Sequence, residues 1–305
     1  MNILVASATA NTGSKLVEIL SANGGVKIKA LVRNPASDGA KALAALPNVT
    51  IVTGDFSNAE SIKTALVGID RAFLVSPAGD DTQYDREVAF ISAAAEAGVE
   101  AVVRISTYGA LIGLTAKCVY AKAHARIEKY VEEHNSRVID LQPNWFMSNW
   151  LSSAAEAKAT GKITMPVADK LRATAMVDTR DVAGAAAAIL LQPKSKLEEF
   201  IKLRYVQVHG PELKTFAEKA EALSKATGKT ISVNIIAPEA FSSMLQGYGM
   251  SEYFANSFTD TIMTVGGAKS GERPHDTECS PLLLEVWKPK YTVDMWAQDH
   301  ASMFA

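Results

Sequence analysis

Short apolar runs alternate with longer amphipathic stretches along the first half of the chain. The apolar runs, each of which predicts a buried strand, lie at residues 3–6, 28–32, 49–53, 71–75, 101–105 and 138–141. The amphipathic stretches, which predict helices, include residues 12–20, 59–66, 84–97 and 121–133. Strands that alternate with helices pair in parallel through right-handed crossovers. The pattern therefore predicts a doubly wound α/β fold, with helices on both faces of a parallel sheet.

The pattern changes beyond Asn149. Helices are predicted over residues 151–159, 182–191 and 215–227, and a strand over residues 231–236. Asp181 stands just before the second of these helices, and we expect it to cap that helix. The last part of the chain carries Tyr248, Trp287 and Trp296 among glycines and methionines, a set that serves equally as core or as pocket lining.

These patterns predict two parts. We expect residues 1–150 to form a Rossmann domain that residues 176–209 complete. Residues 151–175 and 210–305 then form a smaller C-terminal α/β substrate lobe over the ligand cleft. Ligands bind outside the carboxyl ends of the strands in such a sheet, so candidate residues are sought there.

Composition narrows the class of protein. The chain has 305 residues, 48% of them hydrophobic, and a formal net charge of -2 with scattered basic residues. A small-molecule substrate is therefore expected, and neither nucleic acid nor a membrane, with a homodimer left open. The two cysteines give no disulfide framework, and the five histidines lack metal-site spacing, so no metal is expected. The first strand begins without a basic, apolar leader, which favours a cytoplasmic location.

The first predicted strand runs into a tight turn and a helix that begins near Asn11. Such a turn is glycine-rich in a Rossmann unit, because glycine lets the backbone approach a pyrophosphate and lets the helix pack closely. Only one glycine is present here, and one glycine can also serve packing alone. The turn residues expected to contact a dinucleotide are Ser7, Thr9, Ala10, Asn11, Thr12 and Gly13.

Arg33 directly follows the second predicted strand. Sites for NAD usually place Asp or Glu near this strand end to hold the ribose 2′-hydroxyl, whereas an arginine nearby pairs with the 2′-phosphate of NADP. Asn34 and Pro35 follow Arg33, and no acidic residue adjoins it. A solvated arginine is the alternative interpretation. Together with the turn, Arg33 favours NADP(H) as the cofactor.

A series of short motifs runs between residues 7 and 183, at residues 7–13, 31–35, 54–56, 73–77, 105–109, 142–147 and 177–183. In order and spacing they resemble the NmrA-like group of atypical short-chain dehydrogenase/reductases. The resemblance implies a Rossmann domain with a small C-terminal substrate lobe and an NADP(H) site. Members usually keep two or three glycines in the first turn, where this chain has Ser7 and Ala10. The additional Cβ atoms predict weaker cofactor binding.

The resemblance also assigns the rest of the cofactor site. It implies that Asp55 and Phe56 lie near the adenine, that Val75, Ser76 and Pro77 lie along the ribose, and that Asn144, Trp145 and Phe146 lie near the nicotinamide. Each set has a structural alternative: a capped turn at Asp55, a strand stop at Pro77, and core packing for Trp145 and Phe146.

Short-chain reductases use a serine, a tyrosine and a lysine four residues after the tyrosine. Here Tyr120 is followed four residues later by His124, and Ser106 lies upstream at the end of the fifth predicted strand. The frame resembles that triad with His124 in place of lysine. An imidazole titrates near neutral pH and can relay a proton to Tyr120. The alternative is that Tyr120 and His124 only stack one turn apart on a helix surface.

The expected function is an oxidoreductase in which NADPH reduces a small carbonyl, imine or conjugated compound. One alternative is a regulatory protein that senses NADP(H) without turnover. A non-redox isomerase or cyclase on the same scaffold is another.

Overall fold

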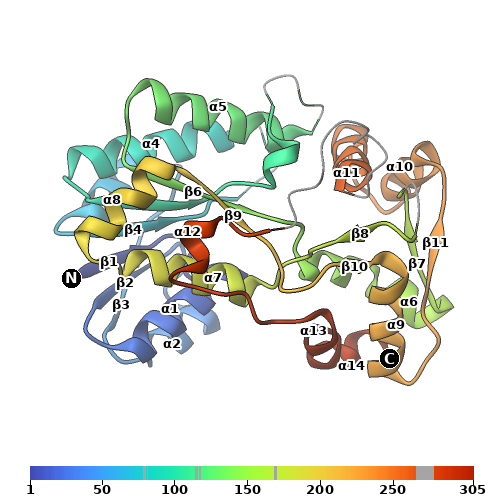
Figure 1. Cartoon of the computed structure of the whole chain (residues 1–305). Coiled ribbons are helices and arrows are strands. Elements are labelled where there is room, and N and C mark those ends of the chain that lie inside the picture. The colour runs from blue at the N-terminus through green and yellow to red at the C-terminus, as the bar shows by residue number, and fades with distance from the viewer. Residues whose placement is uncertain (78–79, 81, 114–115, 117, 168–169, 266–277) are drawn as a thin grey trace.

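The computed structural model describes residues 1–77, 80, 82–113, 116, 118–167, 170–265 and 278–305 (Figure 1). A seven-stranded sheet has the order β3-β2-β1-β4-β5-β6-β9, and each neighbouring pair is parallel. Its strands are β1 (Asn2–Val5), β2 (Lys27–Val32), β3 (Val49–Thr53), β4 (Arg71–Leu74), β5 (Ala101–Ile105), β6 (Val138–Pro143) and β9 (Tyr205–Val208). The doubly wound α/β fold expected from the sequence is confirmed.

The strand order reverses at β1. From β1 the chain builds outward through β2 to β3, and it then returns to place β4 on the other side of β1. At such a switch point the loops that leave β1 and β4 diverge, and they open a crevice beyond the carboxyl ends of these strands.

Helices cover both faces of this sheet (Figure 1). One set, α1 (Asn11–Asn23), α2 (Asp38–Ala44), α7 (Thr179–Leu190), α8 (Lys194–Leu203) and α12 (Pro281–Leu284), shares a hydrophobic cluster with alternate strand residues such as Ile3 and Val5. The opposite face, with Leu4 and Ala6, packs against α3 (Ala59–Leu66), α4 (Gln83–Glu96) and α5 (Val119–Glu133). Because helices cover both faces, the inner strands β1, β4, β5 and β6 are almost entirely buried.

A second hydrophobic cluster, which we call the lobe core, forms beside the sheet. Its aromatic members are Tyr108, Trp145, Trp150, Phe216, Phe241, Trp296 and Phe304. Its elements are η1 (Gly109–Leu111), η2 (Met147–Ser153), α6 (Ala154–Thr160), β7 (Lys162–Met165), β8 (Ala173–Thr174), β10 (Lys214–Thr215), α9 (Phe216–Thr227), β11 (Ser232–Ile235), α10 (Pro238–Gly247), α11 (Glu252–Val265), α13 (Val293–Asp299) and α14 (Ala301–Phe304). Strand β7 pairs with β11 in parallel, and β8 pairs with β10 antiparallel.

The helix cap expected at Asp181 is wrong. Helix α7 begins at Thr179, and its N-cap is Asp178, which accepts a 2.8 Å hydrogen bond from the Arg180 backbone N–H. The buried carboxylate of Asp181 lies one turn further on and accepts bonds of 3.0 Å from the N–H groups of Lys290 and Tyr291. Asp181 therefore ties the C-terminal segment to α7.

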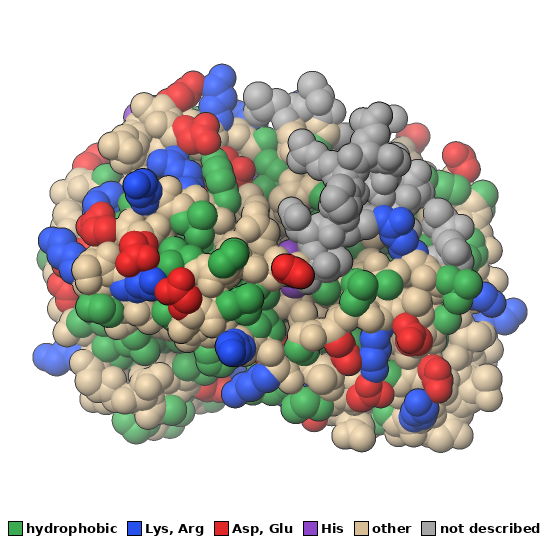
Figure 2. Space-filling view, in the orientation of Figure 1, with side chains coloured by type: hydrophobic (Ala, Val, Ile, Leu, Met, Phe, Trp, Pro, Cys, Tyr) green, Lys and Arg blue, Asp and Glu red, His purple; other side chains and the backbone are tan. Residues whose placement is uncertain are grey.

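The surface has no division by charge in the view of Figure 2, where acidic and basic side chains are interspersed. Within the described ranges, no helix is both long enough and apolar enough to cross a membrane. One segment assigned to the lobe from the sequence packs elsewhere: Cys279 and Leu283 belong to the hydrophobic cluster on the α1 and α7 side of the sheet.

Candidate cofactor site and buried ionic network

A cavity of about 450 Å³ opens at the carboxyl ends of β1 to β4, at the switch point of the sheet. It brings together many of the residues expected to bind cofactor: Ser7, Thr9, Ala10, Arg33, Asp55, Phe56, Val75, Ser76 and Pro77. The sequence analysis missed Ser57 and Arg86, which also line this cavity. Ser57 follows the Asp55 motif directly, and so could have been found from it.

The turn after β1 keeps the shape of a glycine turn. Ser7 has φ = 48°, in the left-handed region that favours glycine. Its carbonyl oxygen accepts a 2.9 Å hydrogen bond from the Ala10 N–H, which closes the turn. A Cβ built on Gly13 would stand 2.4 Å from the same carbonyl oxygen, so the helix approaches the turn as closely as the backbone allows.

Helix α1 begins beside this cavity, since Thr9 and Ala10 line it. The N-cap residue Ala10 provides no side-chain hydrogen bond, and the first turn contains no acidic residue. The leading N–H groups of α1 are therefore available to an anion, which the positive end of the helix dipole also favours. Asn11 is exposed at this end and lines a neighbouring cavity, whereas Thr12 is buried.

Two arginines flank Asp55 at the rim of the cavity. Asp55 accepts hydrogen bonds of 2.8 Å from both the N–H and the hydroxyl of Ser57; these bonds, together with the charges of Arg33 and Arg86, lower its pKa. Arg86 donates to the Pro77 carbonyl oxygen (2.6 Å) and pairs with Asp80. Arg33 is exposed and, among the described residues, forms no ion pair. It is thus the free cation of the rim.

Asn144, Trp145 and Phe146 follow β6 and do not line this cavity. Asn144 is buried; its Nδ2 lies 2.9 Å from Nδ1 of His209, and its Oδ1 accepts from the Trp145 N–H. Trp145 belongs to the lobe core, with its ring 6.1 Å from that of Phe216. These contacts support the structural interpretation for Trp145, while Phe146 is half-buried.

Tyr120 and His124, the two residues of the expected proton relay, bond to different partners. The Tyr120 hydroxyl bonds to Ser257 and Thr261 of α11, and burial raises its pKa to about 12. Nδ1 of His124 lies 3.1 Å from Nη1 of Arg104. The expectation that His124 titrates near neutrality is wrong, because burial and the Arg104 charge lower its pKa to about 3. Among the described residues, no hydrogen bond joins Tyr120 to His124.

His124 belongs to a buried ionic network that the sequence analysis missed. Arg104 of β5 is fully buried and pairs with Glu87 of α4 at 2.8 Å and with Asp140 of β6 at 2.5 Å. Glu87 of this network accepts a 2.7 Å hydrogen bond from the hydroxyl of Ser76, a residue that lines the cofactor cavity. The network therefore extends to the edge of the cavity. The available signal was a charged residue inside each of two otherwise apolar predicted strands, Arg104 in residues 101–105 and Asp140 in residues 138–141.

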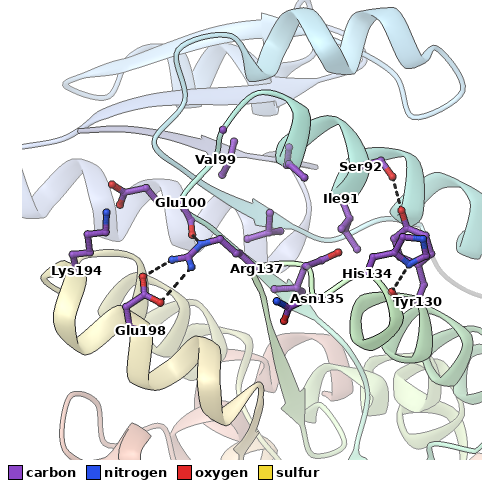
Figure 3. Close-up of a pocket in the computed structure, with 16 residues that line it drawn as sticks. Ile91, Ser92, Val99, Glu100, Tyr130, His134, Asn135, Arg137, Lys194 and Glu198 are labelled. Carbon is purple, nitrogen blue, oxygen red and sulfur yellow. Dashed lines mark hydrogen bonds and ion pairs between the residues drawn. The ribbon is translucent and has the colours of Figure 1, made fainter.

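A larger cavity of about 700 Å³ lies at the opposite, amino-terminal ends of β5 and β6 (Figure 3). Figure 3 shows Arg137 joined to Glu198, and Tyr130 joined to Ser92. Arg137 pairs with Glu198 at 2.6 Å, and Tyr130 bonds to Ser92 at 2.8 Å. Ligands of α/β sheets bind at the other end of the strands, so this cavity is the weaker candidate despite its volume.

Among the residues described, no group of three or more His, Cys, Asp or Glu side chains could hold a metal ion. The chemistry available at the switch point is instead that of a dinucleotide: a free arginine, an uncapped helix N-terminus and a tight turn.

Comparison with known proteins agrees with this arrangement. The sequence model of the NmrA-like family matches residues 1–297. The NAD(P)H azoreductase of Xenophilus azovorans is 30% identical over 258 residues, which cover 85% of this chain and 85% of that protein. Quinone oxidoreductase 2 of Escherichia coli is 26% identical over 271 residues, 88% of this chain and 89% of that protein. The similarity spans both parts of the fold.

A solved structure shares this fold at low identity. The negative transcriptional regulator NmrA, crystallised in complex with NAD, superposes with a TM-score of 0.76 at 17% identity. The match covers 99% of this chain and 95% of that one. At this identity the likeness concerns the fold alone.

Proposed function

The chain belongs to the NmrA-like family, and from that membership we propose that it is an NADPH-dependent oxidoreductase. Its substrate is a small carbonyl, imine or conjugated compound. The observation that carries the proposal is the cavity at the switch point, where the unpaired Arg33 stands at the rim and α1 begins without a cap. These features suit the 2′-phosphate and the pyrophosphate of NADPH. The relatives named azoreductase and quinone oxidoreductase support the reaction class.

The residues present fit the cofactor. The left-handed Ser7 gives the turn its glycine-like shape, and Gly13 leaves no side chain between helix and turn. We assign the pyrophosphate to the N–H groups of Thr9, Asn11 and Thr12, around the beginning of α1, because the Ala10 N–H already donates to Ser7. Arg33 takes the 2′-phosphate through its guanidinium fork.

The rest of the cavity accommodates the adenosine. Asp55 and Phe56 border the adenine, and Val75, Ser76 and Pro77 follow the ribose along the end of β4. We assign the nicotinamide end to the segment that follows β6, through Asn144 and the half-buried Phe146, while Trp145 packs in the lobe core. When bound, the nicotinamide ring supplies a hydride to the substrate. The protein contributes orientation, exclusion of water by the lobe, and a proton.

A titration followed by a turnover assay tests this function. Tryptophan fluorescence of the purified protein is measured against NADPH and NADH, with at least about tenfold tighter binding expected for NADPH. NADPH oxidation is then followed with a panel of azo, quinone, imine and enone compounds, at least one of which is expected to be reduced. Tighter NADH binding would contradict the cofactor assignment.

The second candidate is a regulatory protein that binds NADP(H) without turnover. His124 favours it, because this residue occupies the position of the usual lysine and its low pKa keeps it uncharged. The regulator that shares the fold is consistent with it. NADPH binding without oxidation by any compound of the panel would select this candidate.

A further inference from the structure

Ser106 lies beside the candidate cofactor cavity although it does not line it. In the parallel register of β4 and β5, Leu74 pairs with Arg104. The residues two positions beyond this pair are Ser76, which lines the cavity, and Ser106. Ser106 is only 4% exposed, so its hydroxyl is shielded from bulk water. Ser106 follows the carboxyl end of β5, the end of the strands at which ligands of such sheets bind.

A carboxyl group lies directly behind Ser106. Its hydroxyl is 2.8 Å from Oε1 of Glu128, a buried residue of α5. The Gln142 side-chain amide donates to the same oxygen at 3.3 Å. When Glu128 is ionised, the Ser106 hydroxyl must donate to it. When Oε1 of Glu128 holds a proton, this O–H can donate to the Ser106 oxygen, and the serine hydrogen is then free for a substrate oxygen.

The surroundings of Glu128 favour the protonated form. Arg104, its nearest cation, stands 3.9 Å away and already pairs more closely with Glu87 and Asp140. Burial and the Asp140 charge raise the pKa of Glu128 to about 7, against the opposing effects of Arg104, Ser106 and Gln142. The ionisable and charged groups around this carboxyl are Arg104 of β5, Asp140 of β6, Glu87 of α4, His124 and Glu132 of α5, and Tyr205 of β9.

We propose that Glu128 is a positioning residue that holds the proton of the reduction and passes it through Ser106 to the substrate. The proposal rests on the reductase function proposed above. As a carbonyl carbon receives the hydride, the C=O π electrons move to oxygen, which takes the Ser106 hydroxyl proton. The Ser106 oxygen takes the proton of Glu128. The resulting carboxylate, beside Arg104, is reprotonated from solvent before the next turnover.

The Glu128→Gln variant separates the relay from a merely structural role. Its amide can still donate to Ser106 but cannot deliver a proton. The rate kcat is measured between about pH 5 and about pH 9, with NADPH and the best compound of the panel. For the parent, kcat is expected to fall about tenfold per pH unit above about pH 7. For Glu128→Gln, kcat is expected to be about a hundredfold lower at pH 6 and flat with pH.

Further variants keep the test decisive. NADPH affinity of Glu128→Gln is expected to stay within about twofold, because the carboxyl does not line the cofactor cavity. Glu133→Gln, on the exposed side of the same helix beside Lys129, is expected to keep the parent profile. Ser106→Ala removes the relay with little change in packing and is expected to lose the pH dependence, whereas Ser106→Thr keeps a hydroxyl and is expected to retain it.

Two outcomes would overturn the proposal in different ways. A Glu128→Gln or Ser106→Ala protein with near-parental kcat and an unchanged fall above pH 7 removes the relay and leaves the reductase intact. A parent that binds NADPH but reduces no compound removes both the reductase and the relay.

Discussion

Gly13 stands so close to Ser7 that a Cβ on the glycine would lie 2.4 Å from the serine carbonyl oxygen. The atom it would meet belongs to the backbone, so no rotamer change could relieve the clash. Ser7 in turn holds the left-handed conformation, at φ = 48°. The one glycine of the turn therefore lies where there is no space for a side chain. Ser7 lies where the backbone must be left-handed.

Gly13→Ala is expected to lower the free energy of unfolding by about 3 kcal/mol, because α1 must move away from the turn. Urea denaturation measures this loss. Gly247→Ala is the matched control: no atom lies within 4 Å of its added Cβ, and it is a helix residue. The free energy of unfolding of Gly247→Ala should rise by up to about 1 kcal/mol. Equal effects of the two substitutions would contradict the close approach at Gly13.

Ser7→Gly is expected to raise the free energy of unfolding by about 1 kcal/mol, because it relieves the left-handed serine. NADPH binding should also tighten several-fold, since the backbone can then approach the pyrophosphate. Fluorescence titration and urea denaturation are the measurements. Asn48→Gly, at φ = 62° away from the cavity, should gain stability without a change in affinity. Weaker NADPH binding by Ser7→Gly would mean that the serine side chain itself contacts the ligand.

Arg33→Ala is expected to weaken NADPH binding about tenfold and to leave NADH binding almost unchanged, because only NADPH carries the 2′-phosphate. Arg137→Ala removes another exposed arginine, at the opposite end of the sheet, and should affect the binding of neither cofactor. The two dissociation constants of each variant are compared with those of the parent. An equal loss of affinity for both cofactors would show that Arg33 does not bind the 2′-phosphate.

Tyr120→Phe is expected to change kcat by less than about threefold. Its hydroxyl bonds to Ser257 and Thr261 of α11, and its pKa of about 12 disfavours release of its proton at neutral pH. The lost hydrogen bonds should lower stability by about 1 kcal/mol, measured by urea denaturation. A loss of kcat of about a hundredfold, with NADPH affinity unchanged, would restore Tyr120 as the proton donor expected from the sequence.

Lys219 provides a prediction about pH. It is 1% exposed on α9, bonds to Thr174, and burial lowers its pKa from 10.5 to about 7. Between these two values the unfolded chain binds a proton that the folded chain has released. Stability should therefore rise with pH across this range, by at most about 1.4 kcal/mol per pH unit.

Lys219→Met should remove this rise and increase stability at pH 7 or below by about 2 kcal/mol, after the loss of the Thr174 bond. Lys225→Met, exposed on the same helix beside Glu221, should leave the pH dependence unchanged. The measurement is the urea midpoint from about pH 6 to about pH 10. A Lys219→Met protein with the parental pH slope would show that Lys219 stays charged when folded.

The pattern of hydrophobic and polar residues was sufficient to predict most strands of the Rossmann sheet. The bounds of β3 and β5 agree with the prediction to the residue, because both strands are rich in β-branched residues. Strand β9 was not predicted. It is an edge strand of four residues, Tyr205–Val208, with alternating half-buried and buried positions, and it acquires its place only by pairing with β6. Tertiary pairing, rather than local pattern, defines it.

The candidate site divides in the same way. Arg33 and the Asp55 motif follow predicted strands, and parallel strands end at one edge, so their meeting could be predicted. The role of His124 could not be predicted from the sequence. The spacing of Tyr120 and His124 correctly placed both residues on one helix. The partner of the His124 imidazole, however, is the buried Arg104 of β5, and the sequence does not show that these two side chains meet. Charges such as Arg104 and Asp140 are solvated in most sequences, and only the sheet register shows that these two face each other.

The chain passes between the sheet and the lobe core more than once. It first enters the lobe after Ile105, at Tyr108, and it leaves the sheet again after Pro143. It returns at Val177, leaves once more after Val208, and enters the lobe a fourth time before Val293. A hinge at a single linker is therefore unavailable, because several crossing segments would have to bend together. A lobe borrowed from a relative would need matched junctions at every crossing, so changes of specificity by point substitution are more accessible than exchange of the whole lobe.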